Sequence, residues 1–290
     1  MTNQSVKPSL AMPVANLAAS TAFYTDCLGF TLADQQPATD AAHIIDSDGD
    51  PLLLVGPQAE DVTPYLAESH FFTRPGQTIN FLGDDLDVRR AALLQKGLTD
   101  VQLVEKRWGD RSLIVKDPDG YALQFIANAP RSSEEGLALY ARGPQELEAA
   151  LAGLSEADLH LSRAEGEWSI RAIVQHLAGT ETLFAPSMEM ALAESGRTYH
   201  HNWPTSNQRT AKELDYAGRP IEPSLALIRA VHAHILQLAQ HVPGAWERYV
   251  QDPPGRKRSF GDLVTIVATH IPEHIDEILE IRRIHERSCR

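Results

Sequence analysis

Two histidines near the C-terminus lie four residues apart, which is a spacing that proteins use to build metal sites on helices. They are His270 and His274, in the segment TIVATHIPEHIDEI at residues 265–278. Four residues of helix rise by about 6 Å and return to the same face. Both rings can therefore reach one ion at the usual metal–nitrogen distance of about 2.0–2.1 Å. Pro272 lies between them and removes a helical hydrogen bond, so a metal site, two core histidines and a loop are all open at this point.

The apolar pattern around the pair favours a helix that continues, bent, through Pro272. Buried-type residues and the two histidines step by four, three, four, four and three residues, at Leu263, Val267, His270, His274, Ile278 and Ile281. Both imidazoles are then expected to face a mostly apolar core, where each ring needs a polar partner. A single inward histidine would be best explained as a satisfied core residue, whereas a pair on one stripe is harder to explain in that way.

A metal site needs a third ligand, and the best candidate is His176 in WSIRAIVQHLAGTE. Three neutral imidazoles suit a divalent metal such as zinc or nickel, and they leave one coordination position open for water or a thiolate. We therefore predict the metal ligands to be His176, His270 and His274, with no other catalytic residue identified. Glu181, Glu273 and Glu277 are close enough in sequence to support the ligands, but ordinary exposed helix charge is the preferred interpretation for each.

The other histidines give weaker signals, although ten of the twelve in the chain follow residue 130. His232 and His234 are two residues apart, so a helix would point them to different faces. A loop near residues 199–203 could border the metal, through Tyr199, His201 or Trp203, or be solvated together with His200. Surface positions are expected for His160, His241 and His285.

The second half of the chain has the apolar period of helices. Four are predicted, at residues 144–155, 168–184, 224–242 and 259–286, with Ser169 and the Ser259/Asp262 pair as N-terminal caps. The long connection between the second and third helices predicts an all-α four-helix bundle with a crossover. A Pro-, Ser- and Glu-containing linker is expected at about residues 128–136, so this domain spans residues 131–290.

The first half has the short apolar runs and turn signals of strands. Strand, helix and three strands follow one another from residue 9 to residue 56, and the same order recurs from residue 77 to residue 127. The sequence thus predicts an α+β N-terminal domain of paired βαβββ units, residues 1–130, which can curl around a shared concave pocket.

The segments VANLAASTAFYTDCLGF and WGDRSLIVKDPDGYALQFI resemble the glyoxalase, bleomycin-resistance and extradiol-dioxygenase superfamily, also called vicinal oxygen chelate proteins. The resemblance covers about residues 7–129. It implies metal ligands at the positions of Ser9, Thr78 and Gln124, but the two hydroxyls are poor ligands for zinc, nickel or iron. We therefore expect ligand binding without metal in this domain, as in the bleomycin-resistance branch. A relocated ligand at His43 or His70 is the alternative; a strand-edge or loop histidine is preferred for both.

The segments GPQELEAALAGLSEADL, GEWSIRAIVQHLAGTE and SFGDLVTIVATHIPEHIDEI resemble the DinB/YfiT-like bundle superfamily over about residues 137–287. The resemblance implies a divalent metal held by one histidine on the second helix and an H-x-x-x-H pair on the fourth. Those positions hold His176, His270 and His274. It also implies metal-assisted thiol transfer to an electrophile, or hydrolysis of a small molecule.

The net charge of −13 argues against nucleic acid and anionic membranes as partners. No apolar run reaches the roughly 18 residues of a membrane span, and two cysteines give no disulfide framework, so a cytoplasmic protein is expected. Both resemblances imply a homodimer.

Together the two resemblances imply a detoxification or stress-resistance protein whose partner is a small molecule and whose second substrate could be a low-molecular-weight thiol. The expected enzyme is a metal-dependent thiol transferase or hydrolase. The alternative from another class is a non-catalytic protein that binds and sequesters a drug or toxin and has a structural metal.

Overall fold

The computed structural model describes residues 7–36, 39–68, 70–83, 85–200, 207–252 and 255–288. The chain divides into two compact units, residues 1–130 and 131–290.

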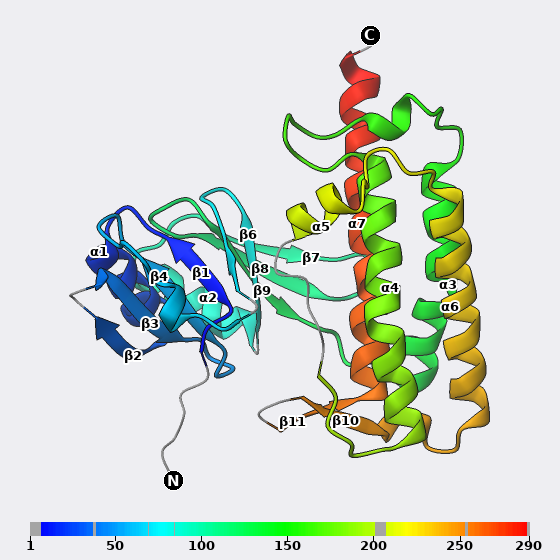
Figure 1. Cartoon of the computed structure of the whole chain (residues 1–290), viewed down its shortest axis with the longest axis horizontal. Helices are drawn as coiled ribbons and strands as arrows, with labels where there is room; N and C mark the ends of the chain where they lie inside the picture. The colour runs from blue at the N-terminus through cyan, green and yellow to red at the C-terminus, as the bar shows by residue number, and fades with distance from the viewer. Residues whose placement is uncertain are drawn as a thin grey trace. The chain divides into compact units, whose positions relative to one another are not determined.

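The first unit contains the predicted βαβββ order twice (Figure 1). The first copy consists of β1 (Leu10–Pro13), α1 (Leu17–Ala22) continued by a π-helical turn (Phe23–Cys27), β2 (Thr31–Gln36), β3 (Ala41–Ile45) and β4 (Pro51–Val55). The second consists of β6 (Thr78–Leu82), α2 (Leu86–Gln95), β7 (Val101–Glu105), β8 (Arg111–Lys116) and β9 (Ala122–Ala127). A short strand that the sequence did not indicate, β5 (Phe71–Phe72), joins the first sheet.

The two copies have the same sheet topology. The first sheet has the order β2-β3-β4-β1-β5 and the second β6-β9-β8-β7, and in each the opening strand pairs in parallel with the last strand of its copy. Alternate residues of both sheets bury their side chains in one shared apolar cluster, as period-two patterning requires. Such alternating residues include Met12 and Val14 in and just after β1, Ile79 and Phe81 in β6, and Leu123 and Phe125 in β9. The fold class predicted for this half is confirmed.

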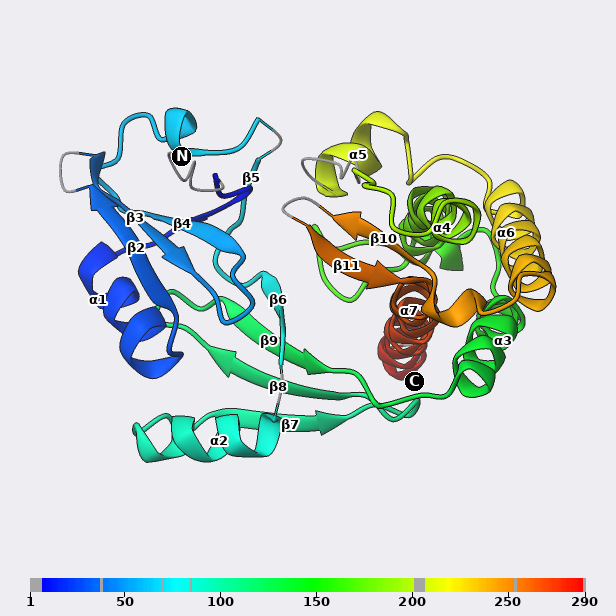
Figure 2. The same ribbon diagram turned by 90° about the horizontal axis from the view of Figure 1, so that it is seen from below.

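The second unit is a bundle of four long helices (Figures 1 and 2). They are α3 (Ser133–Leu151), α4 (Ile170–Ala193), α6 (Glu222–His241) and α7 (Phe260–Ser288). Around the bundle, α7 packs on α3 and α4, and α6 packs on the same two helices. The 24-residue α4 and the 29-residue α7 present their apolar stripes to a common core. The predicted four-helix bundle is confirmed.

The linker prediction is wrong at its second half, because α3 begins at Ser133 rather than after residue 136. Ser132 and Glu135 form a capping box, in which each side chain binds the other residue's backbone amide. Two acidic residues in the first turn also suit the positive end of the helix dipole. Polar composition therefore marked a helix start here.

The long connection between α4 and α6 contains a helix that the sequence analysis did not predict, α5 (Asn207–Glu213). A hairpin of β10 (Tyr249–Asp252) and β11 (Arg256–Ser259), also unexpected, precedes α7. The capping pair predicted at the start of α7 is present: the Ser259 amide donates to Asp262 at 2.8 Å, and the Asp262 amide donates to Ser259 Oγ at 3.0 Å.

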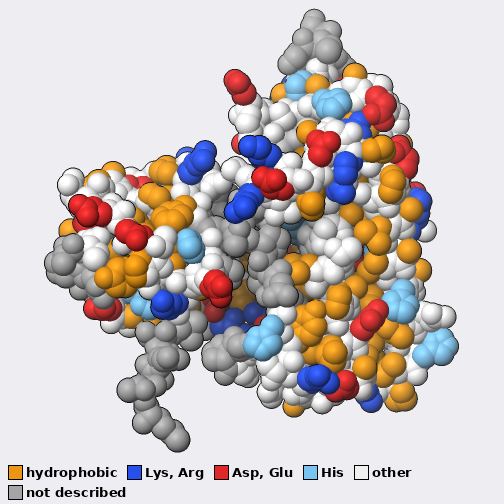
Figure 3. Space-filling model, in the orientation of Figure 1, with side chains coloured by type: hydrophobic (Ala, Val, Ile, Leu, Met, Phe, Trp, Pro, Cys, Tyr) orange, Lys and Arg blue, Asp and Glu red, His pale blue; other side chains and the backbone are white. Residues whose placement is uncertain are grey.

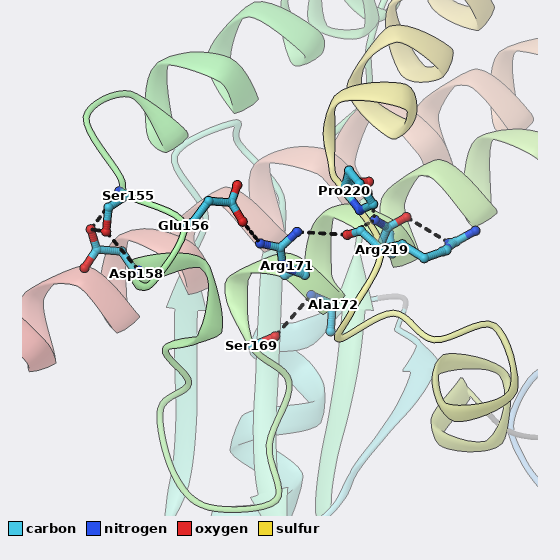
Figure 4. A network of polar contacts seen from close by, with 9 residues as sticks. Ser155, Glu156, Asp158, Ser169, Arg171, Ala172, Arg219 and Pro220 are labelled. Carbon is cyan, nitrogen blue, oxygen red and sulfur yellow. Dashed lines mark hydrogen bonds and ion pairs between the residues drawn. The ribbon is translucent and has the colours of Figure 1, made fainter.

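The start of α4 is anchored by a polar network (Figure 4). Ser169 is the N-cap and accepts from the Ala172 amide at 3.3 Å. The Arg171 side chain is buried, donates to the Arg219 carbonyl at 2.9 Å, and also binds Glu156. These contacts tie the segments before α4 and before α6 to the first turn of α4, which is the helix that carries His176.

Charged side chains of both signs are interspersed on the face shown in Figure 3. Among the described residues, no helix is long and apolar enough to cross a membrane.

Replacing Ser169 by Ala removes the acceptor that caps α4. We expect the free energy of unfolding to fall by about 1 kcal/mol, because an orphan amide of the first turn loses its partner. Urea unfolding followed by helical circular dichroism measures the change. Ser162→Ala is the matched control, since the Ser162 hydroxyl donates to the nearby Ala164 carbonyl at 2.9 Å and caps no helix. Equal stabilities for the two variants would contradict the assigned cap.

Candidate metal centre

The three predicted histidines lie together in the helical unit. His270 Nε2 is 3.2 Å from His176 Nε2 and 3.1 Å from His274 Nε2. The three rings meet edge to face, with centroids 4.6–5.1 Å apart. Among the described residues, they form the one group of three or more His, Cys, Asp or Glu whose ligand atoms could share an ion.

Two helices position these rings. His176 lies in α4 beside the buried Leu177, and the other two histidines lie on the stripe of α7 that also buries Val267 and Ile278. The α-helix continues through Pro272 without a break, so the loop alternative is wrong. All three histidines are half-buried. The stripe read from the sequence is therefore the face that α7 turns toward the bundle core.

Glu277 determines which nitrogen of His274 carries hydrogen. His274 Nδ1 lies 2.9 Å from Glu277 Oε2, and a carboxylate can only accept. The ring therefore donates from Nδ1 and turns the lone pair of Nε2 toward His270. Arg163, from the segment between α3 and α4, holds the other oxygen of Glu277 at 2.9 Å. A carboxylate that binds the outer nitrogen of a ligand histidine is the usual support of a metal site.

The environment keeps the His176 and His270 rings uncharged. Burial, and then the charge of His274, lower the pKa of His176 to about 3. Burial, His274 and His176 likewise lower the pKa of His270 well below its ordinary value. Burial alone would raise the pKa of Glu277, but the hydrogen bond and charge of His274, together with Arg163, lower it overall. At neutral pH the cluster thus presents imidazole lone pairs beside an ionised carboxylate.

Hydrogen bonds cannot satisfy this arrangement. If His270 carries its hydrogen on Nε2, that hydrogen can point well at only one of the two neighbouring nitrogens, His176 Nε2 or His274 Nε2. A neutral ring with its hydrogen on Nε2 has no hydrogen on Nδ1. His270 Nδ1 is itself buried without a hydrogen-bond partner in the protein. A tetrahedral ion with bonds of about 2.0–2.1 Å would place its nitrogen ligands about 3.3–3.4 Å apart. The observed spacings of 3.1 and 3.2 Å are close to this value, so the donor set fits a cation.

The segment between α3 and α4 contacts the cluster at two points. Arg163 reaches it through Glu277, and Trp168 packs against His176 with ring centroids 4.7 Å apart. Neither role was predicted. Trp168 stood out only as an apolar residue before a helix cap, and the pairing of Arg163 with α7 has no local sequence signal.

The preferred interpretation of exposed helix charge is wrong for two glutamates. Glu277 binds His274 and has 18% of its side chain exposed, and Glu181 is only 1% exposed. Glu273 is half-buried. Glu181 binds His232, which is also buried and which the sequence analysis gave little weight. His232 could have been found, because it continues the α6 stripe between Ile228 and Ile235.

The remaining histidines of this unit mostly follow expectation. His234 is exposed while His232 is buried, so the prediction of different faces is confirmed. Of the others expected at the surface, His160 and His241 are exposed, while His285 is half-buried and contacts the Ser162 carbonyl. His200 is exposed and Tyr199 is half-buried beside β10. His201 and Trp203 lie outside the described residues.

In the first unit, two of the three positions implied by the resemblance hold hydroxyl side chains, which are poor ligands, and the third holds a glutamine. Ser9 precedes β1, whereas Thr78 and Gln124 lie on the neighbouring strands β6 and β9. Metal-free binding in this unit stays a prediction. His70 lies in a loop, as expected, and contacts the Ala67 carbonyl at 2.8 Å.

His43 does not fit the strand-edge interpretation, because β3 is paired on both sides by β2 and β4. The ring lines a cavity of about 160 Å³, together with Lys7, Asp34, Leu53 and Tyr65 among others. Burial lowers the pKa of His43, although the charge of Asp34 acts in the opposite direction. The cavity is therefore lined by apolar side chains, an uncharged ring and charges of both signs.

Two family models match the chain. Residues 8–125 match the Glyoxalase/Bleomycin resistance protein/Dioxygenase superfamily, and residues 139–278 match the DinB superfamily. The first match lies within the first compact unit and the second lies within the helical unit. Both resemblances seen in the sequence are thus confirmed. The three clustered histidines fall within the DinB match.

Relatives of known name are similar over much of their own length. A protein of Geobacillus thermodenitrificans (strain NG80-2), named "Putative metal-dependent hydrolase", is 27% identical over 173 residues, which are 58% of this chain and 96% of the relative. A protein of Geobacillus kaustophilus (strain HTA426) with the same description is 26% identical over 174 residues, 58% of this chain and 96% of the relative.

Solved structures are similar to each domain. YfiT from Bacillus subtilis, described as "a probable metal-dependent hydrolase with an unusual four-helix bundle topology", is 19% identical with a TM-score of 0.48, over 55% of this chain and 93% of its own. TioX from Micromonospora sp. ML1 is 21% identical with a TM-score of 0.35, over 43% of this chain and 100% of its own.

The histidine cluster makes the metal-free DinB domain sensitive to acid. Above pH 6.5, His176 and His270 are neutral in both the folded and the unfolded chain. Below pH 6.5 these histidines bind protons in the unfolded chain but not in the folded chain, where their pKa values are lowered. We expect the free energy of unfolding to fall with decreasing pH from about 6.5 to 4, by up to roughly 1.4 kcal/mol per pH unit for each histidine. Protonation of Glu277 acts in the same direction, as the pH falls from the ordinary glutamate pKa toward its lowered pKa.

Urea unfolding in the presence of a chelator, followed by helical circular dichroism, measures this slope. His176→Gln removes one of the two groups and should flatten the dependence, whereas His160→Gln changes an exposed histidine and should not. A wild-type stability that is level between pH 7 and pH 4.5 would show that the rings are not held neutral.

Proposed function

We propose that the DinB domain is a metal-dependent hydrolase of a small molecule, with a divalent metal held by His176, His270 and His274. The observation that carries this proposal is the convergence of three Nε2 atoms at 3.1 and 3.2 Å with too few hydrogens to join them. The names of the Geobacillus relatives agree with it. A structural role for the three histidines would instead require a hydrogen-bond partner for each ring.

Zinc and nickel are the metals that best suit the proposed donor set. Both accept neutral imidazole, and catalytic sites of this kind use three protein ligands and keep one position open. Such a metal supplies Lewis acidity, with which it can activate a water molecule or a thiolate. The protein itself contributes the ligand geometry and the ionised Glu277, which can keep the His274 ring oriented while the open position is used.

Thiol transfer is the second chemistry open to the same centre. Transfer from a low-molecular-weight thiol to an electrophile needs the same open position, so the triad supports both reactions. They differ in what is consumed: hydrolysis proceeds in water alone, whereas transfer stops when the thiol is withheld. We place hydrolysis first because the relatives carry that name.

The glyoxalase-superfamily domain is proposed to bind a small ligand without metal. Its cavity beside β3 supports this role, because about 160 Å³ is the size of cavity that holds a six-membered ring. Binding with no turnover by the whole chain would favour the alternative function, which is sequestration of a drug or toxin.

Metal content tests the proposed centre directly. We expect the purified chain to bind about one equivalent of zinc or nickel after reloading, and His270→Ala to bind at least tenfold more weakly, because His270 contacts both other rings. His241→Ala is the control, since His241 is an exposed histidine of the same domain. Equal metal binding by the wild type and His270→Ala would overturn the ligand assignment.

The same proteins test the reaction. Turnover of a panel of esters and amides without thiol, and of electrophiles with bacillithiol, mycothiol or glutathione, should be lost on chelation and in His270→Ala. Activity that survives both treatments would exclude a metal-dependent hydrolase or transferase at this site. Metal binding with no turnover of either panel would favour the sequestration alternative.

Glu277→Gln tests the support of the ligand His274. A neutral amide can still accept the Nδ1–H, but it no longer supplies the charge that raises the basicity of Nε2. We expect roughly 10- to 100-fold weaker metal binding with little loss of helical structure. Competition against a chromogenic chelator measures the affinity.

Glu280→Gln is the matched control for this substitution. Glu280 also pairs with Arg163, at 3.7 Å, but it is exposed, and this ion pair does not involve the three rings. Its replacement should leave the affinity unchanged. If the two variants bind metal equally well, Glu277 does not support the centre.

A further inference from the structure

A second polar cluster lies in the bundle core and is not part of the proposed metal centre. It consists of Tyr140 of α3, Glu181 of α4 and His232 of α6, which are 0%, 1% and 2% exposed. His232 Nε2 lies 2.7 Å from Glu181 Oε1, and its ring stacks on that of Tyr140 with centroids 3.7 Å apart and planes within 7°. The cluster therefore joins three of the four long helices.

Pro144 leaves the Tyr140 carbonyl without its helical donor, so that this carbonyl can accept a hydrogen bond from His232. His232 Nδ1 lies 2.7 Å from the Tyr140 carbonyl, and a carbonyl only accepts, so Nδ1 carries hydrogen. In a helix this carbonyl would accept from the amide of residue 144, but that residue is Pro144 and has no amide hydrogen. Both ring nitrogens of His232 are thus engaged, one by α3 and one by α4.

The neighbouring glycine gives the ring its space. A Cβ at Gly143 would lie 3.2 Å from Ile271 Cδ1 and 3.5 Å from His232 Cε1. Gly143 therefore lets α3 approach both α6 and α7 at this level. Ile271 directly follows His270 in α7, and Glu181 follows His176 by five residues in α4. Gly143 thus lies between His232 of the cluster and Ile271 of the α7 turn that carries His270, and Glu181 shares α4 with His176.

A buried pair of this kind contributes little net stability. Desolvation of a carboxylate and an imidazole offsets most of their attraction, and apolar residues of similar size often serve as well. What a buried polar pair does supply is registration, because its hydrogen bonds form at one relative position of the helices. The surrounding core is built of Leu, Ile, Val and Ala, whose apolar contacts are not directional in the way that a hydrogen bond is. A ligand set, in contrast, needs placement to within about 0.5 Å.

We propose that Tyr140, Glu181 and His232 form a register lock that positions His176 of α4 against His270 and His274 of α7. The inference rests on the proposed function, since it concerns the geometry of the proposed metal centre. Glu181 and His232 are positioning residues: they act through the helices and are not assigned any contact with the metal or the substrate.

The structure offers a matched control. His234 and Glu189 form a second His–Glu pair between the same two helices, 2.9 Å apart, but about half of each side chain is exposed. The double variants E181L/H232L and E189L/H234L therefore make the same chemical change in the core and at the surface. E181Q is the conservative variant, because a glutamine amide can donate to His232 Nε2 and keep the link.

The test is metal affinity, measured by competition with a chelator, together with the visible absorption spectrum of the cobalt-loaded chain. We expect E181L/H232L to fold, to bind zinc or nickel at least about tenfold more weakly, and to show an altered cobalt spectrum. E181Q and E189L/H234L should stay close to wild type in both. A purely structural role would change the unfolding temperature and leave the affinity and spectrum of the folded protein unchanged.

Pro144→Ala is a second, milder variant. The restored amide at position 144 would compete with His232 for the Tyr140 carbonyl, so the affinity should fall in the same direction while α3 stays helical. Wild-type affinity and spectrum in both E181L/H232L and Pro144→Ala would overturn the lock. If neither variant folds, the cluster serves stability and the lock is also overturned. If the wild type binds no divalent metal, that result overturns the proposed function, and the register lock is overturned as a consequence.

Discussion

The helical domain depends on one constraint: three imidazoles from two helices must meet in a largely apolar interior. Burial lowers the pKa values of His176 and His270, so at neutral pH each of these two rings is uncharged and carries a single hydrogen. The interaction of His274 with Glu277 then directs a lone pair toward the other two rings. Everything around the cluster follows from this need, including the anchored start of α4, the unbroken α7 and the Arg163 contact that holds Glu277.

Periodicity was sufficient to predict the fold of both domains. The repeated strand and helix order from residue 9 to residue 127 became two sheets of identical topology, because alternate apolar residues need a common core. The helical stripes predicted the four long helices, and even Pro272 did not interrupt the last one. The prediction was wrong where polar residues are compatible with both a linker and a helix start. Ser132 and Glu135 were interpreted as linker, although the same residues form a capping box when a helix follows.

The candidate ligands could be predicted because they lie on stripes within single helices, and a family resemblance joined those helices. Their supports could not, because each depends on contacts between elements. Glu277 lies three residues from His274, yet a glutamate at that spacing is exposed in most helices. Glu181 is buried because it pairs with His232 on another helix, and the sequence near Glu181 does not indicate this partner. Local pattern thus finds the ligands, and tertiary pairing determines how they are held.

His232 in the same bundle shows how a structural histidine is held in this core. His232 is more deeply buried than any of the three clustered rings, yet both its nitrogens have acceptors, at 2.7 Å each. A core histidine in this fold is therefore satisfied by a carbonyl that Pro144 leaves free and by a carboxylate. The triad breaks that rule: its Nε2 atoms face one another, and His270 Nδ1 has no hydrogen-bond partner in the protein. Two arrangements so different, on the same α4 helix, are most simply explained if one is completed by protein atoms and the other by a cation.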